Sequence, residues 1–468
     1  MTETIRKNLN DHAWARWSAM LLIALMMLFA HMFVDVISPL KELIQVQRGW
    51  TSDVFGTYAG SEYLLNVWGF LIVAGIILDK MGLRFTGELS AIIMFAGACI
   101  KYYAISDAFI GSGLETWLNS WWVSMPASAK LASLGFMIFG CGCEMAGITA
   151  SKAMAKWFEG KEMALAMGLE MALARVGVFF IFTISPRVAG IGGADPSIVR
   201  PVAFCTALLL IGLICYTIFC LMDKKLDTQL GASSTGESEE EFKISDIGKI
   251  FSSRLFWIVA MLCVLYYSAI FPFQKFAANM LQSNLGISAT AASDIFRWFP
   301  IGAALITPFL GWFLDRKGKG ATMLILGSLL MIICHTTFAL VLPVVPSKTV
   351  AFAAIILLGI SFSLVPAALW PSIPKIMDKR YLGSAYSLIF WVQNFGLSGT
   401  PIMIGYALEK TNPGVAEQIA AGVEGATYNY TVPMLLFASL GVLALLFALW
   451  LKADDARNHY GLEQPNIK

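Results

Sequence analysis

The chain has 468 residues, of which 57% are hydrophobic and 14% are charged, and its formal net charge is +2. Soluble domains contain roughly a quarter of charged residues, so this composition excludes an ordinary soluble fold and predicts a membrane protein. The small net charge gives no support for nucleic-acid binding. The eight cysteines lie in apolar runs without metal-ligand spacing, so we expect buried thiols, no metal and no cofactor.

Apolar runs long enough to cross a membrane recur along the whole chain. A crossing helix needs about 20 mostly apolar residues. The first half predicts six spans, at 17–39, 54–78, 85–105, 131–155, 163–184 and 202–222. The second half predicts six more, at 255–281, 291–314, 321–343, 350–376, 382–408 and 431–452. We therefore expect an all-α membrane protein with two six-helix bundles, residues 1–222 and 250–468, joined by a polar linker at 223–249.

The connections between the spans predict the orientation. Trp117, Trp121 and Trp122, between the third and fourth spans, suit an element at the level of the lipid headgroups. Basic residues are concentrated in alternate connections, which are therefore expected to be cytoplasmic together with both termini. These residues are Lys80, Arg84, Lys156, Lys161, Lys224, Lys225, Arg316, Lys317, Lys319, Lys379 and Arg380.

One pattern, G-x-x-x-D-x-x-G, ends an apolar span in each half. Its glycines allow close helix contact, while the acid and the nearby basic residues can meet helix ends or lipid phosphates. The repetition indicates two related halves and predicts a role in gating, although turn formation and lipid anchoring are the simpler alternative. The pattern comprises Gly75, Asp79, Gly82 and the nearby Arg84 in the first half, and Gly311, Asp315, Arg316 and Gly318 in the second.

Two charged residues lie deep in apolar spans, where an ion is usually tolerated only inside a bundle or an aqueous cavity. At 1.5 Å per residue, Glu144 lies about 20 Å from the outer end of the fourth span, and Arg175 lies about 18 Å from the inner end of the fifth. Adjacent antiparallel helices can join them in an ion pair that only holds the helices together. They can also present both groups to one solute, and the residues alone leave both interpretations open.

The repeated pattern resembles the cytoplasmic loop signature of the major facilitator superfamily. The run from Gly142 to Gly177, with Glu144 and Arg175, resembles the family of the major facilitator superfamily domain-containing protein one, whose best-known members are lysosomal dipeptide uniporters. The second half agrees in Tyr266-Tyr267, Phe271-Pro272-Phe273, Leu369-Trp370-Pro371, Gly383-Ser384-Ala385-Tyr386 and Gln393-Asn394-Phe395-Gly396-Leu397. The resemblance implies the major facilitator fold, with inverted repeats within each half and bundles that move around a central cavity.

The resemblance also implies roles for individual residues. Glu144 and Arg175 match a carboxylate and an arginine that contact the charged ends of a dipeptide. A carboxylate for the ammonium and a guanidinium for the carboxylate would grip the peptide ends and leave the side chains free. When the cytoplasmic side closes, Asp79 and Arg84 are expected to contact the eleventh helix of the other bundle, and Asp315 is expected to act in the mirror-image position.

Other polar residues of the first half are further site candidates. Glu62 and Asn66 lie one turn apart and are expected either to line the cavity or to form a structural hydrogen bond. Lys152 either contacts solute or extends toward the cytoplasmic end. Glu170 stands where the related proteins often have glutamine, which makes it a candidate proton carrier.

In the second half, Tyr266, Tyr267, Trp370 and Asn394 supply aromatic walls and an amide, with ordinary helix packing as the alternative. Lys275 lies toward the outer end of the seventh span, where it can attract an acidic solute or pair across an outer gate. Asp35, near the outer end of the first span, is one possible partner.

The function predicted is transport of short peptides by alternating access, as a monomer. Facilitated diffusion is favoured because the first span lacks the E-x-x-E-R phrase of peptide symporters, while proton coupling stays open. One alternative is import of anionic organic or sugar acids that bind Arg175 and Lys152, and a lower one is a membrane receptor or scaffold. No catalytic group predicts an enzyme. The N-terminal segment lacks an acidic dileucine signal, so we expect a bacterial inner membrane or a cell surface.

Overall fold

The computed structural model describes residues 8–230, 247–377 and 382–465. The acidic part of the expected linker, together with Lys379 and Arg380, lies outside the described residues. Within those residues the regular structure is helical. By length and composition, ten helical stretches of the described residues are suited to cross a membrane.

The helices follow the predicted spans closely. The part before the linker contains η1 (Leu9–Asp11), α1 (Ala13–Val34), η2 (Ser38–Leu40), α2 (Lys41–Arg48), α3 (Ser52–Ser61), α4 (Leu64–Val67), α5 (Phe70–Ile105), α6 (Gly113–Asn119), α7 (Ala127–Trp157), α8 (Met163–Val188) and α9 (Val199–Leu230). The part after it contains α10 (Ile247–Phe251), α11 (Arg254–Leu285), α12 (Ala289–Phe296), α13 (Trp298–Lys317), α14 (Gly320–Thr336), the π-helical turn η5 (Thr337–Val341), α15 (Lys348–Ile376), α16 (Leu382–Thr411), α17 (Val415–Ala420) and α18 (Thr431–Asn458).

The second and third expected spans differ most from the prediction. Residues 54–78 are divided among α3, α4 and the start of α5, while α5 continues through the third span. Gly82 interrupts α5 with a non-helical backbone at φ 80°, where a residue without a Cβ is favoured. The expected eleventh span lies in α16, which is not among the ten apolar stretches. The count of twelve and the bundle boundaries stay predictions.

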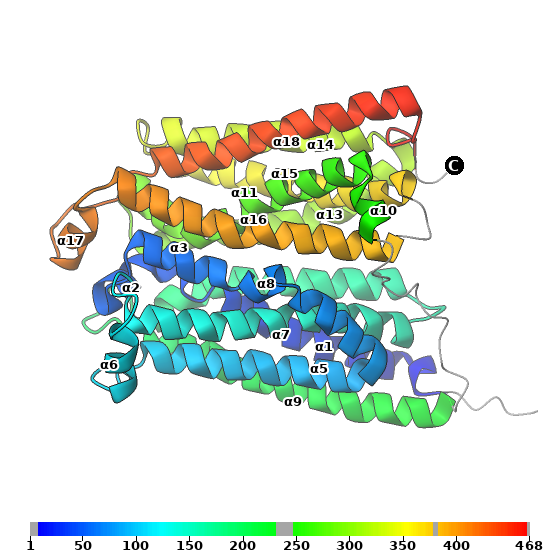
Figure 1. Ribbon diagram of the computed structural model, residues 1–468, viewed down its shortest axis with the longest axis horizontal. Helices are drawn as coiled ribbons and strands as arrows, with labels where there is room; N and C mark the ends of the chain where they lie inside the picture. The colour runs from blue at the N-terminus through cyan, green and yellow to red at the C-terminus, as the bar shows by residue number, and fades with distance from the viewer. Residues whose placement is uncertain (1–7, 231–246, 378–381, 466–468) are drawn as a thin grey trace, which may run out of the picture.

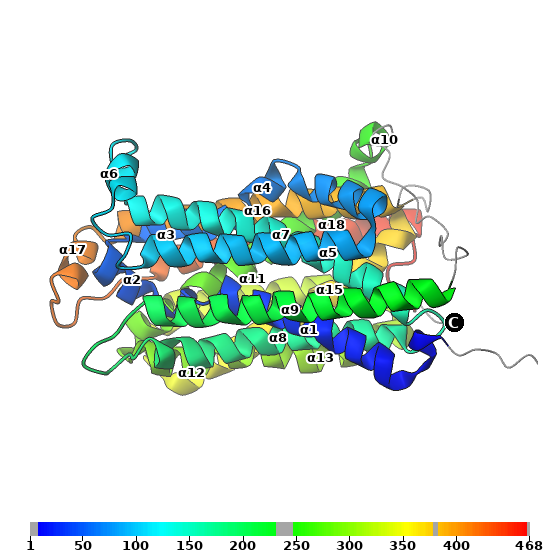
Figure 2. The same ribbon diagram turned by 90° about the horizontal axis from the view of Figure 1, so that it is seen from below.

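The helices before and after the linker form two groups that lie side by side (Figure 1). In the first group α5 packs on α7, and α1 packs on α8 and α9; in the second, α14 packs on α15 and α18. We call the end with α2, α6 and α17 the distal end, and the end with α10 and the last described residues the linker end. Figure 2 shows that η1 and the last described residues both lie at the linker end.

The two halves meet most closely at the distal end, where α3 runs beside α16 (Figure 1). A Cβ added at Gly56 would lie 2.3 Å from the carbonyl oxygen of Pro401, and one added at Gly60 would lie 2.3 Å from that of Ser398. Small residues therefore allow these two backbones to touch. The close contact expected at Gly75 and Gly311 is not formed: an added Cβ there would meet no described atom within 4 Å.

Beside this contact, the helix is interrupted between α3 and α5. α3 ends at Ser61, and Gly69 begins α5 from a left-handed backbone at φ 92°. Two carbonyl oxygens of this region accept hydrogen bonds from α16: that of Gly60 from the Ser398 hydroxyl at 2.9 Å, and that of Val67 from Trp391 Nε1 at 2.8 Å. The other half of the molecule thus satisfies backbone groups of the broken helix.

Candidate functional site

Glu144 lies on α7 and is partly exposed. No hydrogen bond or ion pair joins its carboxylate to another described residue. One turn earlier, Gly140 packs against the backbone of Glu62, because a Cβ there would lie 1.9 Å from the Glu62 carbonyl oxygen. This close approach brings Glu62 within electrostatic range of Glu144. An unpaired carboxylate at this depth is costly, which favours a water-filled site or a cationic ligand beside it.

Arg175 lies on α8 and points toward the second half. Its guanidinium carbon is 4.7 Å from the ring centroid of Phe362 on α15 and 5.6 Å from that of Phe271 on α11. These are cation–π distances, which compensate a buried cation only in part. No ion pair between Arg175 and Glu144, or between Arg175 and any other described acid, is formed. The locking pair that the sequence left open is therefore absent from this structure, and both charges keep their capacity to bind.

An aromatic cluster of the second half continues from Arg175. The Tyr267 ring stacks on Phe271 at 5.6 Å, and Trp370 Nε1 donates a 3.1 Å hydrogen bond to the Tyr267 hydroxyl. Trp370 in turn stacks on Phe390 of α16 at 4.8 Å. Tyr267 and Trp370 are thus connected to Arg175 through the ring of Phe271, and their role as aromatic walls stays a prediction. Phe271 was missed as a wall residue, although its position four residues after Tyr267 puts both on one helix face.

Tyr266 does not belong to this wall. It is 1% exposed and packs inside the second half, where a Cβ added at Gly327 would lie 2.2 Å from its hydroxyl. Successive residues of a helix point about 100° apart, so Tyr266 and Tyr267 cannot face the same side. The expectation for Tyr266 is therefore corrected: it is a core residue of the second half.

Asn66 and Asn394 are buried rather than displayed on an open surface. Asn66, on α4, is 0% exposed, and neither polar atom of its side chain has a hydrogen-bond partner among the described residues. Asn394, on α16, donates a 2.9 Å hydrogen bond to the Phe390 carbonyl, and its Oδ1 has no described partner. α4 and α16 pack on each other, so both amides lie near the contact between the halves. Their unused hydrogen-bonding capacity is unusual for buried groups.

The charges of the first glycine–acid motif are paired within the first half. Lys152 Nζ lies 2.9 Å from Asp79 Oδ1, and Arg84 contacts Asp223 at 3.2 Å and also Asp227. Lys152 is thus held toward the linker end, about 12 Å along α7 from Glu144. No hydrogen bond or ion pair joins Asp79 or Arg84 to a described residue of the other half, so the contact expected for the state that is closed at this end is not seen among the described residues.

The C-terminal segment Gly461–Pro465 packs on the end of the second motif, at Gly318. Gly318 has φ 70°, and an added Cβ would lie 2.4 Å from the Glu463 carbonyl oxygen. The backbone amides of Lys319 and Gly320 donate to the carbonyls of Glu463 and Leu462 at 3.1 and 3.0 Å. Elsewhere in this motif, Arg316 lies over the ring of Trp312 at 5.0 Å, and Asp315 is within electrostatic range of Lys375.

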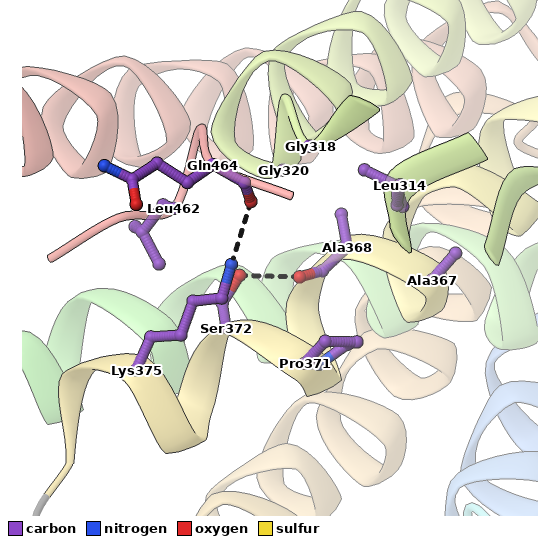
Figure 3. Close-up of a pocket in the computed structure, with 10 residues that line it drawn as sticks. All are labelled: Leu314, Gly318, Gly320, Ala367, Ala368, Pro371, Ser372, Lys375, Leu462 and Gln464. Carbon is purple, nitrogen blue, oxygen red and sulfur yellow. Dashed lines mark hydrogen bonds between the residues drawn. The ribbon is translucent and has the colours of Figure 1, made fainter. Parts of the chain in front are cut away.

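A small cavity lies under this segment, as Figure 3 shows. Lys375 spans it and donates a 3.1 Å hydrogen bond to the Gln464 carbonyl. The cavity has a volume of about 10 Å³, which is room for roughly one water molecule, so it is not a solute site.

Glu62 and Glu170 complete the set of predicted acids. Glu62 forms an ion pair at 3.1 Å with Lys275 of the second half, and Lys275 also pairs at 3.2 Å with Asp35, the partner that the sequence suggested. Glu170 is partly exposed on α8 and has no hydrogen bond or ion pair to another described residue. Because Glu170 precedes Arg175 by five residues, it lies on a different face of α8.

Comparison with known proteins agrees with this architecture. The family model described as Major Facilitator Superfamily matches residues 23–401 and 273–466. The chain is 28% identical to the "Lysosomal dipeptide transporter MFSD1" of Danio rerio over 79% of the chain and 75% of that protein. It is 28% identical to the Homo sapiens protein of the same name over 60% of the chain and 59% of that protein.

Solved transporters share the fold. A bacterial homologue of the human lysosomal transporter Spinster, in an inward-facing and unoccupied conformation, superposes with a TM-score of 0.69 at 15% identity and covers 94% of this chain and 98% of its own. A D-xylose–proton symporter superposes with a TM-score of 0.67 at 14% identity, over 92% of this chain and 97% of its own. With a family model that spans most of its length, the chain belongs to the Major Facilitator Superfamily and is a membrane transporter rather than an enzyme.

Proposed function

We propose that this transporter carries dipeptides across the membrane by alternating access. The observation that carries the proposal is a pair of opposite charges, Glu144 and Arg175, which lie on adjacent membrane helices and form no ion pair with each other or with another described residue. A dipeptide is a zwitterion, so it offers an ammonium for Glu144 and a carboxylate for the planar fork of Arg175. The likeness to proteins named as lysosomal dipeptide transporters supports the same substrate class.

The aromatic cluster supports a broad specificity. Tyr267, Phe271 and Trp370 offer ring faces and one hydroxyl beside Arg175, without another charge. Such surfaces contact side chains of different shapes through dispersion and hydrophobic burial. In this arrangement charged groups bind the two ends of the peptide, and the aromatic rings contact its side chains. We therefore expect a transporter that accepts many dipeptides.

The conformation fits one stage of the cycle. The halves are joined at the distal end by α3 and α16, and Gly75 and Gly311 stand free of close contact toward the linker end. In our proposal, the opposite stage closes the linker end through Asp79, Arg84 and Asp315 and opens the distal end. In this proposal the membrane is a bacterial inner membrane, and the linker end faces the cytoplasm because basic residues are concentrated in the connections expected on that side.

Uptake into liposomes tests the substrate. Purified protein should accumulate labelled alanyl-alanine inside vesicles loaded with the unlabelled dipeptide, and excess unlabelled dipeptides should compete. Glu144→Gln and Arg175→Ala should each lower uptake by at least about tenfold, because removal of one partner of a charged contact costs roughly 1.5–3 kcal/mol. Met163→Leu, on the same helix as Arg175 but exposed at its start, is the matched control and should keep full uptake.

A second candidate is import of an anionic organic or sugar acid, favoured by the absence of an acidic partner for Arg175. The carboxylates of Glu62 and Glu144 would repel an anion near them, which counts against this candidate. Competition separates the two candidates, since lactate or sialic acid should not displace labelled dipeptide if the peptide proposal holds. A proton gradient applied to the same vesicles decides whether Glu170 has a coupling role, which the Glu170→Gln variant would then remove.

A further inference from the structure

The first half carries a complete binding site for an ammonium group, and in this structure a lysine of the second half occupies it. Lys275 Nζ lies 3.0 Å from the carbonyl oxygen of Val34, 3.1 Å from Glu62 Oε2 and 3.2 Å from Asp35 Oδ1. We call these three acceptors the ammonium cradle. Lys275, Glu62 and Asp35 are 5%, 4% and 1% exposed, so the contact is enclosed.

The cradle has the chemistry that a primary ammonium needs. An ammonium has three N–H donors and no acceptor, and the cradle supplies three oxygens at hydrogen-bond distance. One of them, the Val34 carbonyl, belongs to the last residue of α1, where the helix dipole favours a cation. Ser38 of the first half donates a 3.0 Å hydrogen bond to Asp35 Oδ1, and Gln274 Nε2 of the second half donates to Asp35 Oδ2, so this carboxylate is held from both sides.

The charge balance of the cradle depends on which half supplies the cation. Asp35 and Glu62 belong to the first half, and Lys275 belongs to the second. A nearby cation of the first half is Lys101, which lies over the rings of Phe33 and Phe136 at 4.1 and 4.4 Å. If the halves separate at the distal end, Lys275 leaves, and two carboxylates remain with at most one lysine near them. Such an excess of buried negative charge is costly until another cation arrives.

The cradle adjoins the proposed substrate site. Glu62 belongs to the cradle, and the close approach of Gly140 to its backbone brings the carboxylate of Glu144 within electrostatic range. A substrate ammonium that enters between the halves therefore meets Glu144, Glu62 and Asp35 in one acidic region.

We infer that the ammonium cradle is a substrate subsite, and that Lys275 is a tethered cation that takes the place of the substrate ammonium when the carrier is empty. In the distally open state the substrate ammonium occupies the cradle, and after its release Lys275 returns and neutralises the carboxylates. This inference rests on the proposed transport of an ammonium-bearing solute and assigns Lys275 to the step in which the empty carrier reorients.

The test compares two fluxes in the same liposomes. Exchange of labelled for unlabelled alanyl-alanine needs only the loaded carrier, whereas net uptake also needs the empty carrier to reorient. Lys275→Met should slow net uptake roughly tenfold or more, because the empty carrier must then bury unpaired carboxylates, and should leave exchange within about threefold of the unmodified protein. Lys348→Met, which removes an exposed lysine, should change neither flux.

A charge-balanced variant separates this role from a structural one. Lys275→Met combined with Asp35→Asn removes one charge of each sign, so net uptake at saturating dipeptide should recover by severalfold over Lys275→Met alone. Because Asp35 is also a cradle acceptor, the half-saturating dipeptide concentration of the double variant should rise. Equal loss of exchange and net uptake in Lys275→Met, with no recovery in the double variant, would show a merely structural lysine. Unchanged net uptake in Lys275→Met would also overturn the inference.

A conformational measurement keeps the inference testable if alanyl-alanine proves not to be transported. Spin labels at Val46→Cys and Val423→Cys, both exposed at the distal end and in different halves, report opening in a background without the native cysteines. Without substrate, Lys275→Met should shift the distance distribution toward longer values, and Lys348→Met should not. An unshifted distribution would exclude Lys275 as the closing cation, whatever the substrate is.

Discussion

The indole Nε1 of Trp391 donates a 2.8 Å hydrogen bond to the carbonyl oxygen of Val67, so a helix of one half completes the backbone of a broken helix in the other. Val67 ends α4, and the next residues, Trp68 and Gly69, leave the helix. The bond exists only while α4 and α16 are together. It therefore couples the local structure of the broken helix to the state of the carrier.

Replacing Trp391 by phenylalanine tests this coupling. Trp391→Phe keeps an aromatic ring but leaves the Val67 carbonyl without its donor, which should weaken the distally closed state by about 1 kcal/mol. Spin-label distances between the distal ends of the halves should shift toward the open form. Trp257→Phe, whose indole bonds within its own half to the Phe251 carbonyl, is the control and should leave the distances unchanged.

The glycine contact at the distal end predicts an asymmetric response to added methyl groups. Gly56→Ala would place a Cβ 2.3 Å from the Pro401 carbonyl oxygen, so the distally closed state should lose about 2 kcal/mol, as expected for overpacking. Gly75→Ala meets open space in this conformation and should leave the same state within about 0.5 kcal/mol. Cysteine accessibility at distal positions in membranes, measured for both variants, checks the prediction, and equal accessibility would contradict it.

The two neighbouring tyrosines should respond differently to loss of the hydroxyl. Tyr267→Phe removes the acceptor of the Trp370 bond and should raise the half-saturating dipeptide concentration roughly fivefold, the equivalent of about 1 kcal/mol. Tyr266→Phe alters a buried residue away from the aromatic cluster and should leave that concentration unchanged. Uptake measured over a range of dipeptide concentrations compares the two, and a larger effect at Tyr266 would refute the assignment.

The C-terminal segment predicts a suppressible defect at Gly318. Gly318→Ala combines a strained backbone at φ 70° with a clash against Glu463, and should lower stability by about 2 kcal/mol. Deleting residues 461–468 removes the clash but not the backbone strain. Gly318→Ala should therefore lower the stability of the deleted protein by less than it lowers that of the full-length protein. Thermal unfolding in detergent measures the four proteins, and an undiminished loss would mean that the segment does not press on Gly318.

Hydropathy predicted the all-helical membrane fold because the bilayer fixes the length and polarity of each span. The sequence singled out Glu144 and Arg175, and suggested Asp35 as a possible partner of Lys275, because charged residues are rare in such spans. The end of α3 at Ser61 was not predicted, because neither Glu62 nor Tyr63 is a helix-breaking residue. The hydrogen bonds from Ser398 and Trp391 compensate that break, and they come from the other half of the sequence.

Side-chain placement was the least predictable part of the site. Tyr266 and Tyr267 are identical in chemistry, and only the rotation of α11 decides which of them faces Arg175. Lys152 pairs with Asp79, 73 positions away on another helix, and a sequence does not specify that contact. Sequence patterns therefore identified most of the groups that carry charge, while the structure decides which of them are paired.

The distal contact of Gly56 and Gly60 with α16 is made by backbone atoms. A glycine has no rotamers to immobilise, so bringing these surfaces together freezes almost no side-chain freedom. α3 and α16 can then come together and separate on every turnover without a large entropic barrier. A few individual hydrogen bonds hold them together. Variation at these glycines is expected to tune how often the carrier cycles, and to leave its choice of cargo untouched.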